Sequence, residues 1–209
     1  MGAPLAYPGP VVRLIEEFAK LPGIGKRTAE RMAFHILSTP RDEAMALALA
    51  VRDCKNSLKA CSRCFNIAEG ELCPVCADPA RDPQQICVTE LPRDAIAIEK
   101  TGIYSGVYHI LQGRISPSEG RAPSDLRIPE LEGRIAEAER AGTPVREVIL
   151  AVRPNAEGDA TAEFVHARLA EKFPALAVTR LARGLASGTD MDNAAASSIM
   201  FAFQGRKQA

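Results

Sequence analysis

Four cysteines in one short stretch constrain the fold of this chain more than any other feature. Cys61 and Cys64 form one C-x-x-C pair, and after eight residues Cys73 and Cys76 form a second. Each pair can bring two sulfurs onto one centre through a tight turn, and together they supply the four thiolates of a closed tetrahedral zinc site. A closed site leaves no position for a reacting water. The spacing therefore predicts one structural zinc ion per chain.

The alternative interpretation of these cysteines is a redox dithiol or a pair of disulfides. The segment Phe65–Leu72 between the pairs is too short to bury a core, so we expect metal to fold it. The first ten residues contain three prolines and no basic start, unlike a signal peptide. We therefore expect the protein to lie in the cytoplasm, where reducing conditions disfavour disulfides. Cys54 is a less favoured alternative ligand, and Cys87, in an apolar run, is expected to be a buried small hydrophobe.

Composition and charge narrow the function classes. The 209 residues can hold one large domain, or two small ones with a zinc module, and no apolar run approaches a membrane helix of about 20 residues. The absence of tryptophan and the 5% aromatic content argue against a surface that stacks single-stranded bases. Residues 1–66 carry ten Lys and Arg against six Asp and Glu, a net charge of +4 that the remainder balances. A basic end beside an acidic remainder is typical of a nucleic-acid contact with a separate partner surface.

Apolar residues at helical spacing predict three helices in the first third of the chain. They are expected over Val11–Lys20, Lys26–Leu37 and Asp42–Ser57. The run Leu21-Pro22-Gly23-Ile24-Gly25 separates the first two, and Pro40 ends the second.

The glycine-containing break carries the functional signal of this region. Gly23 and Gly25 permit backbone conformations closed to other residues, and they let a phosphate approach the main chain. The following helix offers free N–H groups, and Lys26 and Arg27 lie beside this anion pocket. We interpret the segment as a helix-hairpin-helix that holds the DNA backbone without reading bases. The alternative is a plain helix–helix turn, for which the run L-P-G-I-G-K-R-T-A-E-R-M-A is longer than required.

Short apolar strands alternate with helices after the cysteines. The expected strands are Gln85–Thr89, Val107–Leu111, Glu147–Val152 and Ala177–Leu181. The expected helices run from a cap at Asp94 through Glu99, over Pro129–Ala141 and over Asp159–Lys172. This alternation predicts a parallel sheet with helices on both faces.

Three acids are expected at the carboxyl edge of that sheet, where ligands of such folds bind. Glu90 ends the first strand, and Glu157 and Asp159 follow the third. Together they could hold magnesium for phosphoryl chemistry, or they could cap helices and face solvent. No D-x-D pair follows a strand, and the positive charge of Arg153 in this loop opposes a divalent cation. Since no nucleophilic site emerges either, we predict no catalytic residue.

In this order, the glycine hairpin, the four cysteines and the strand before Glu90 resemble the RecR family of bacterial recombination proteins. The resemblance runs from Val11 to Arg206. The matching stretches include L-P-G-I-G-K-R-T-A-E-R-M-A-F-H, C-S-R-C-F-N-I, C-P-V-C-A-D-P-A-R-D, I-C-V-T-E, A-I-E-K-T-G-I-Y-S-G-V-Y-H-I-L-Q-G-R-I-S-P, E-V-I-L-A and E-G-D-A-T-A.

The resemblance implies an α/β multi-module fold. Its parts would be a helix-hairpin-helix DNA-binding domain over 1–53, a four-cysteine zinc finger over 54–80, a Toprim domain with a parallel sheet flanked by helices over 81–176, and a C-terminal arm with a helix over 177–209. The zinc would orient the DNA-binding helices relative to the sheet without touching DNA.

The resemblance also implies a function. It indicates a non-enzymatic, nucleoid-associated DNA-repair and recombination factor that acts with RecO and RecF to load the RecA recombinase onto gapped single-stranded DNA. The protein would bind duplex and gapped DNA without sequence specificity, with no membrane contact, as a homo-oligomer, either a dimer or a tetrameric ring. Glu90 and Glu157 would mark the face that binds RecO.

The chain departs from the family and from Toprim enzymes at a few positions. Toprim enzymes carry a catalytic Glu followed by a D-x-D pair; Glu90 fits the first, but Arg153 and Asn155 stand where the pair would be. In the tail, Asp192, Asn193 and Ala195 replace the family's Glu, Tyr and Asp. Two other hypotheses remain: a Toprim-type magnesium-dependent nucleic-acid enzyme, and a zinc-stabilised oligomer whose hairpin serves only packing.

Overall fold

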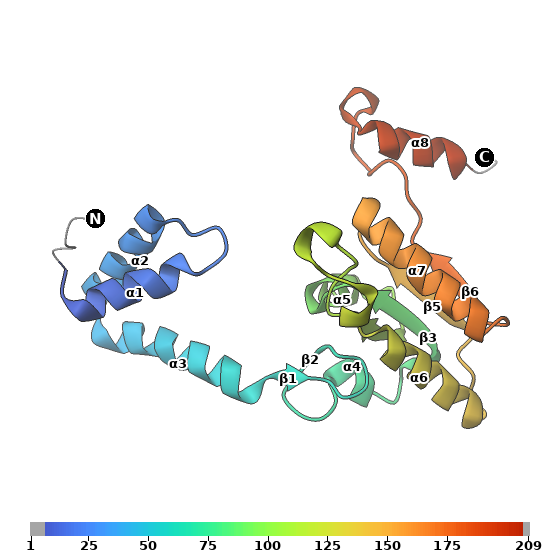
Figure 1. The fold of residues 1–209 in the computed structure, drawn as a ribbon, viewed down its shortest axis with the longest axis horizontal. Coiled ribbons are helices and arrows are strands. Elements are labelled where there is room, and N and C mark those ends of the chain that lie inside the picture. The colour runs from blue at the N-terminus through green and yellow to red at the C-terminus, as the bar shows by residue number, and fades with distance from the viewer. Residues whose placement is uncertain (1–6, 207–209) are drawn as a thin grey trace. The chain divides into compact units, whose positions relative to one another are not determined.

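The structure, a computed structural model, describes residues 7–206 of the chain (Figure 1). It divides into two compact units, 1–58 and 59–209. The segment on which the signal-peptide prediction depends lies largely outside the described residues, as do the last three residues of the predicted arm. Among the described residues, no helix has both the length and the apolar composition needed to cross a membrane.

The N-terminal unit consists of the three predicted helices, here α1 (Gly9–Ala19), α2 (Lys26–Ser38) and α3 (Arg41–Ser57). Each begins and ends within two residues of its predicted bounds. Pro10 is accommodated in the first turn of α1, where no N–H donor is needed. Ala29 and Ala33 on α2 are the buried residues of these helices, and their small side chains allow α1 and α2 to approach closely.

The zinc module opens the second unit. It contains a two-stranded antiparallel ribbon, β1 (Lys59–Ala60) and β2 (Ile67–Ala68), followed by one helical turn, α4 (Pro74–Ala77). Neither short strand was predicted, because two residues carry no periodic signal.

The predicted parallel sheet is confirmed, with the strand order β4-β3-β5-β6. Its strands are β3 (Asp82–Thr89), β4 (Gly106–Ile110), β5 (Glu147–Ala151) and β6 (Ala177–Arg180). Because β6 pairs with β5, the sheet extends past residue 176, where the predicted Toprim domain ends.

Helices cover both faces of the sheet, as predicted. Their bounds are α5 (Pro92–Glu99), α6 (Ile128–Arg140) and α7 (Ala156–Lys172). One core joins α6 and α7 to Val107 and Leu111, while a second joins α5 to Tyr108 and Ile110. Since neighbouring residues of β4 contribute to opposite cores, this strand has the two-residue period of a sheet covered on both sides.

The start of α7 corrects one prediction. Asn155 caps this helix by accepting a hydrogen bond of 2.9 Å from the N–H of Gly158. The helix therefore begins three residues before the predicted Asp159, and Glu157 lies in its first turn instead of in a loop.

Irregular chain joins these elements. The loop between β4 and α6 contains two 3-10 turns, Pro117–Glu119 and Pro123–Asp125. The arm after β6 contains a third 3-10 turn, Met191–Asn193, and ends in α8 (Ala196–Gln204).

Candidate metal centre and nucleic-acid interface

Two local turns build the metal centre. In the first, the N–H of Phe65 donates to the carbonyl of Cys61 over 3.0 Å, and Phe65 adopts a left-handed backbone with φ of 63°. In the second, Cys73 immediately precedes α4, and its carbonyl accepts from the N–H of Ala77 over 3.0 Å. Both turns fold a C-x-x-C pair so that its two side chains point to the same side.

The four predicted ligands converge. The Sγ atoms of Cys61, Cys64, Cys73 and Cys76 all lie within 4.8 Å of one another, and all four residues are buried. Zinc–sulfur bonds of about 2.3 Å in a tetrahedron separate the sulfurs by about 3.8 Å. The cluster therefore fits one four-coordinate structural zinc ion without rearrangement of the backbone.

The two remaining cysteines lie outside this cluster. Cys54 is exposed on α3. Cys87 is buried in the sheet, as predicted, and burial raises the pKa of its thiol to about 12. Neither residue belongs to the group of side chains that could hold the metal.

The cysteines of the cluster share protons. The Sγ atoms of Cys64 and Cys73 are 3.5 Å apart, within hydrogen-bonding distance. Interaction with the neighbouring thiols, together with burial, raises the pKa of Cys64, whereas interaction with Cys64 lowers the pKa of Cys76. Zinc displaces such shared protons when it binds, so its affinity rises with pH.

The zinc module is fastened to the edge strand of the sheet. The N–H of Ile110 donates to the carbonyl of Cys64 over 2.8 Å, and Gln112 donates to the carbonyl of Phe65 over 2.5 Å. The Phe65 ring packs edge-on against His109 and lies 5.0 Å below the guanidinium of Arg127. The pattern of cysteines contains no sign of this contact, because it depends on which strand of the sheet is outermost.

The glycine hairpin lies between α1 and α2. Gly23 has φ of 79°, a left-handed conformation that side chains disfavour, and Ile24 closes the turn by donating its N–H to the carbonyl of Leu21 over 3.0 Å. Gly25 does not use the conformational freedom of glycine, because its φ of −82° and ψ of 165° are available to any residue. What Gly25 contributes is open space above the backbone, since nothing lies within 4 Å of where a Cβ would be.

The start of α2 offers an anion site. Its first helical bond runs from the N–H of Ala29 to the carbonyl of Gly25 over 2.9 Å, which leaves the three preceding amides without partners in the helix. The side chains of Lys26 and Arg27 are exposed beside them. The ion pairs of this unit, among its described residues, are Lys20–Glu17 and Arg52–Asp53. Both basic side chains at the hairpin are thus available to a phosphate.

Each of the three acids at the carboxyl edge of the sheet forms an ion pair with an arginine. Glu90 is 1% exposed; it accepts a 2.8 Å hydrogen bond from the backbone N–H of Arg153, whose Nε lies 3.2 Å from its other oxygen. Glu157 accepts from Ser116 and, over 2.6 Å, from Nε of Arg114, and these bonds lower the pKa of its carboxyl group. Within residues 7–206, the cysteine cluster is the group of side chains arranged for a metal.

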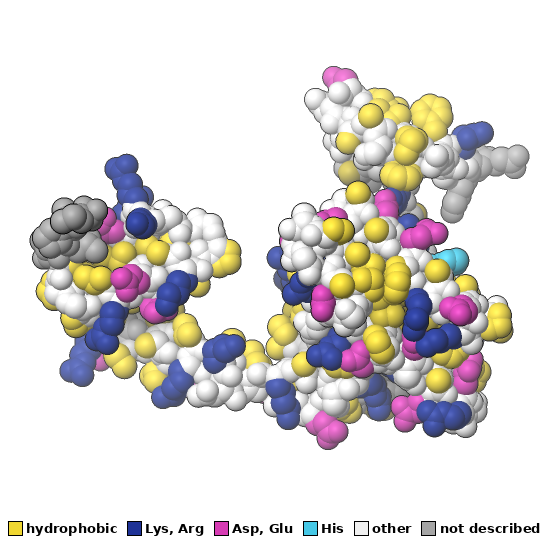
Figure 2. Space-filling model, viewed as in Figure 1, with side chains coloured by type: hydrophobic (Ala, Val, Ile, Leu, Met, Phe, Trp, Pro, Cys, Tyr) yellow, Lys and Arg dark blue, Asp and Glu magenta, His cyan; other side chains and the backbone are white. Residues whose placement is uncertain are grey.

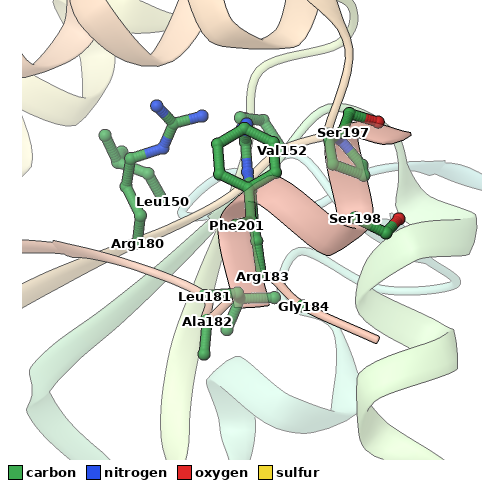
Figure 3. Close-up of a pocket in the computed structure, with 11 residues that line it drawn as sticks. Leu150, Val152, Arg180, Leu181, Ala182, Arg183, Gly184, Ser197, Ser198 and Phe201 are labelled. Atoms are coloured by element: carbon green, nitrogen blue, oxygen red, sulfur yellow. The ribbon is translucent and has the colours of Figure 1, made fainter. Parts of the chain in front are cut away.

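The third acid anchors the C-terminal arm. Asp159 pairs with Arg183 and Arg180, which lower the pKa of its carboxyl group to about 2. The Arg183 guanidinium lies 4.9 Å from the centre of the Phe201 ring on α8. Figure 3 shows this ring over Arg183, in a cavity of about 310 Å³ that Leu150 also lines. Arg183 therefore joins α7 to the arm, a contact that sequence patterns do not reveal.

Comparison with known families identifies each module. The chain matches the helix-hairpin-helix of RecR over residues 11–55, the four-cysteine zinc finger domain of RecR over 58–78 and the Toprim domain over 84–182. It is 50% identical to the recombination protein RecR of Chloroflexus aurantiacus over 95% of this chain and 94% of the relative. It is 45% identical to that of Bifidobacterium longum subsp. infantis over 98% of this chain and 99% of the relative. The chain belongs to the RecR family.

Members of the RecR family are recombination proteins of DNA repair and not enzymes. The geometry of the Toprim sheet agrees. Arg153 lies against Glu90 and Arg114 against Glu157, so arginines occupy the place where an enzyme of this fold would need a metal cation. The RecR-type zinc finger and the four converging cysteines together identify one structural zinc ion.

Proposed function

We propose that this protein is a recombination mediator that holds duplex and gapped DNA through the phosphate backbone at its hairpin. The open start of α2 carries the proposal: three amides and the side chains of Lys26 and Arg27 are available at one point, beside a left-handed glycine. Such contacts give affinity and salt dependence without sequence specificity. DNA bound in this way would place the protein with the nucleoid in the cytoplasm.

The Toprim edge is proposed as the face that meets partner proteins. In keeping with its family, the protein would act with RecO and RecF to load RecA onto gapped single-stranded DNA. Glu90 is buried beneath Arg153, whose side chain is 36% exposed. A partner at this edge therefore meets the arginine and the half-buried Glu157 before it meets Glu90.

Self-association is proposed from the surface of the N-terminal unit. Large apolar side chains are exposed along α2 and α3, and Figure 2 shows hydrophobic side chains on the visible surface of these helices. The exposed large apolar side chains of these two helices are Phe34, Leu37, Met45, Leu47, Leu49 and Val51. A dimer or tetrameric ring would cover such a surface, since isolated monomers rarely expose large apolar patches.

The test of DNA binding uses the double variant Lys26→Ala with Arg27→Ala. Affinity for duplex DNA should fall at low salt, and the slope of log affinity against log salt should shrink by about 0.9 for each phosphate that the variant no longer neutralises. The variant Arg41→Ala with Lys55→Ala removes the same charge from α3 and serves as the control. An equal decrease of affinity in both variants would mean that net charge, and not the hairpin, attracts DNA.

A further inference from the structure

One arginine of the Toprim domain, Arg134 on α6, is not a member of the ion pairs that its helix makes. Arg134 is half-buried on α6, and its Nη1 donates to the backbone carbonyl of Tyr108 over 2.7 Å. Within the described chain, the ion pairs made by the segment 127–140 are Arg127–Glu130, Glu132–Arg168 and Glu132–Lys172. The positive charge of Arg134 is therefore not balanced by a carboxylate.

The geometry of β4 places this charge beside the zinc module. In a parallel strand, alternate residues direct both backbone groups to the same side. Leu111, just past β4, donates to Thr89 of β3 over 2.9 Å, so Tyr108 and Ile110 direct their backbone groups away from the sheet. The N–H of Ile110 binds Cys64, and the carbonyl of Tyr108 binds Arg134. The guanidinium and the first zinc turn thus occupy adjacent positions along one strand edge.

A cation next to the metal centre would offset its charge. Zinc with four thiolates carries a formal charge of −2, and all four cysteines are buried. A buried charge is unfavourable unless other groups compensate it. The helical turn α4, which carries Cys76, packs against β4, the strand to which Arg134 is bound. Nη1 of Arg63 also reaches the carbonyl of Cys76, at 3.5 Å.

We propose that Arg134 is the counter-ion of the zinc–thiolate centre and a positioning residue for it. Its charge offsets the negative charge of the centre, and its hydrogen bond to Tyr108 holds that charge at the junction between the zinc module and the sheet. Zinc affinity thereby depends on a side chain of another module, and loss of the metal leaves Arg134 half-buried without a compensating anion.

The test replaces the charge and retains as much of the hydrogen bonding as possible. Arg134→Gln keeps an N–H donor for the Tyr108 carbonyl but removes the charge, whereas Arg134→Lys keeps the charge. Arg140→Gln removes a charge from the exposed end of the same helix and is the matched control. Zinc affinity is measured by competition with a chromophoric chelator, alongside far-UV circular dichroism to check the fold.

We expect Arg134→Gln to weaken zinc binding about 10- to 100-fold, the range known for groups that support metal ligands. Arg134→Lys should stay within a few-fold of the parent protein, and Arg140→Gln should equal it. A folded Arg134→Gln protein with unchanged affinity would overturn the proposal. So would equal decreases in the Gln and Lys variants, because the Lys variant keeps the charge and its loss could then not explain the effect.

A second measurement decides the matter if Arg134→Gln does not fold. Arg134→Lys is then compared with the parent protein in the same chelator competition. Because lysine keeps the charge, its zinc affinity should stay within a few-fold of the parent protein. A 10-fold or greater decrease in a folded Arg134→Lys protein would show that the charge is not what supports the metal centre, and the proposal would fail.

Discussion

The two units of this protein differ in how they bury apolar surface. In the N-terminal unit, α1 and α3 contain no buried residue, and α2 buries two alanines. In the second unit, the sheet has a separate core on each face, and the zinc module packs on one of them. The sheet is therefore stabilised within its own unit, whereas the three helices leave much of their apolar surface uncovered within theirs.

Helix α3 makes the difference clearest. Its central residues are apolar in every direction, yet Met45, Leu47, Leu49 and Val51 are all exposed. A helix that is apolar all round is normally buried. A unit of about 60 residues also buries a smaller share of its surface than a larger domain does. Both facts indicate that the N-terminal unit depends on contacts outside itself.

Removal of the metal is expected to have the largest effect and would sharpen this comparison. Cys73→Ser should abolish tight zinc binding and destabilise the second unit by several kcal/mol, because structural zinc contributes directly to folding. Helices α1 to α3 should keep their hydrogen-exchange protection, since no ligand lies in their unit. Equal loss of protection in both units would mean that they fold together.

The next prediction compares matched leucines of the two units. Leu131 is fully buried on α6 and Leu49 is 41% exposed on α3. Leu131→Ala should lower the free energy of unfolding by about 2–5 kcal/mol, and Leu49→Ala by less than about 1 kcal/mol. Urea titrations of dilute protein would measure both. A comparable decrease for Leu49→Ala would break the comparison and indicate that its side chain is covered in solution.

A third prediction concerns what covers α3. Met45→Ser with Leu49→Ser should lower the molar mass measured by light scattering, because both changes place a hydroxyl in an apolar contact between copies. Ile103→Ser is the control, since Ile103 is 85% exposed but belongs to the second unit. If both proteins keep the molar mass of the parent, self-association uses another surface.

The smallest effect is expected at the arm. The pKa of Asp159 is held at about 2 by Arg183 and Arg180, below its ordinary value of 3.8, so its carboxylate stabilises the fold above about pH 4. This contribution is lost as the pH falls toward 2. Because the side chain is 41% exposed, solvent screening limits Asp159→Asn to a loss of about 1 kcal/mol or less at neutral pH.

Thermal unfolding of the two proteins between pH 6 and pH 2 measures this difference. The gap between Asp159→Asn and the parent protein should close below about pH 4. A constant gap over the whole range would show that the ion pair does not stabilise the arm. Loss of zinc in acid affects both proteins equally and leaves the gap interpretable.

Local patterns predicted much of the fold because their physical causes are local. Helices α1 to α3 follow from apolar spacing and Pro40, and the zinc ligands follow from two C-x-x-C turns. The start of α7 was missed because the cap at Asn155 is a single side chain. The sequence left open that Gly23 takes a left-handed backbone and Gly25 an extended one, because composition does not distinguish a glycine needed for φ from one that leaves open space.

By itself, the sequence determined the modules, the four cysteines that converge on one zinc site, and the hairpin with its two basic side chains. These features arise from residues close together in the chain. Only the tertiary structure decided that arginines neutralise the acids of the sheet edge and that Arg134 binds the same strand edge as the zinc module. Such pairings depend on which strand lies at the edge and which helix crosses it, and therefore on contacts between residues far apart in sequence.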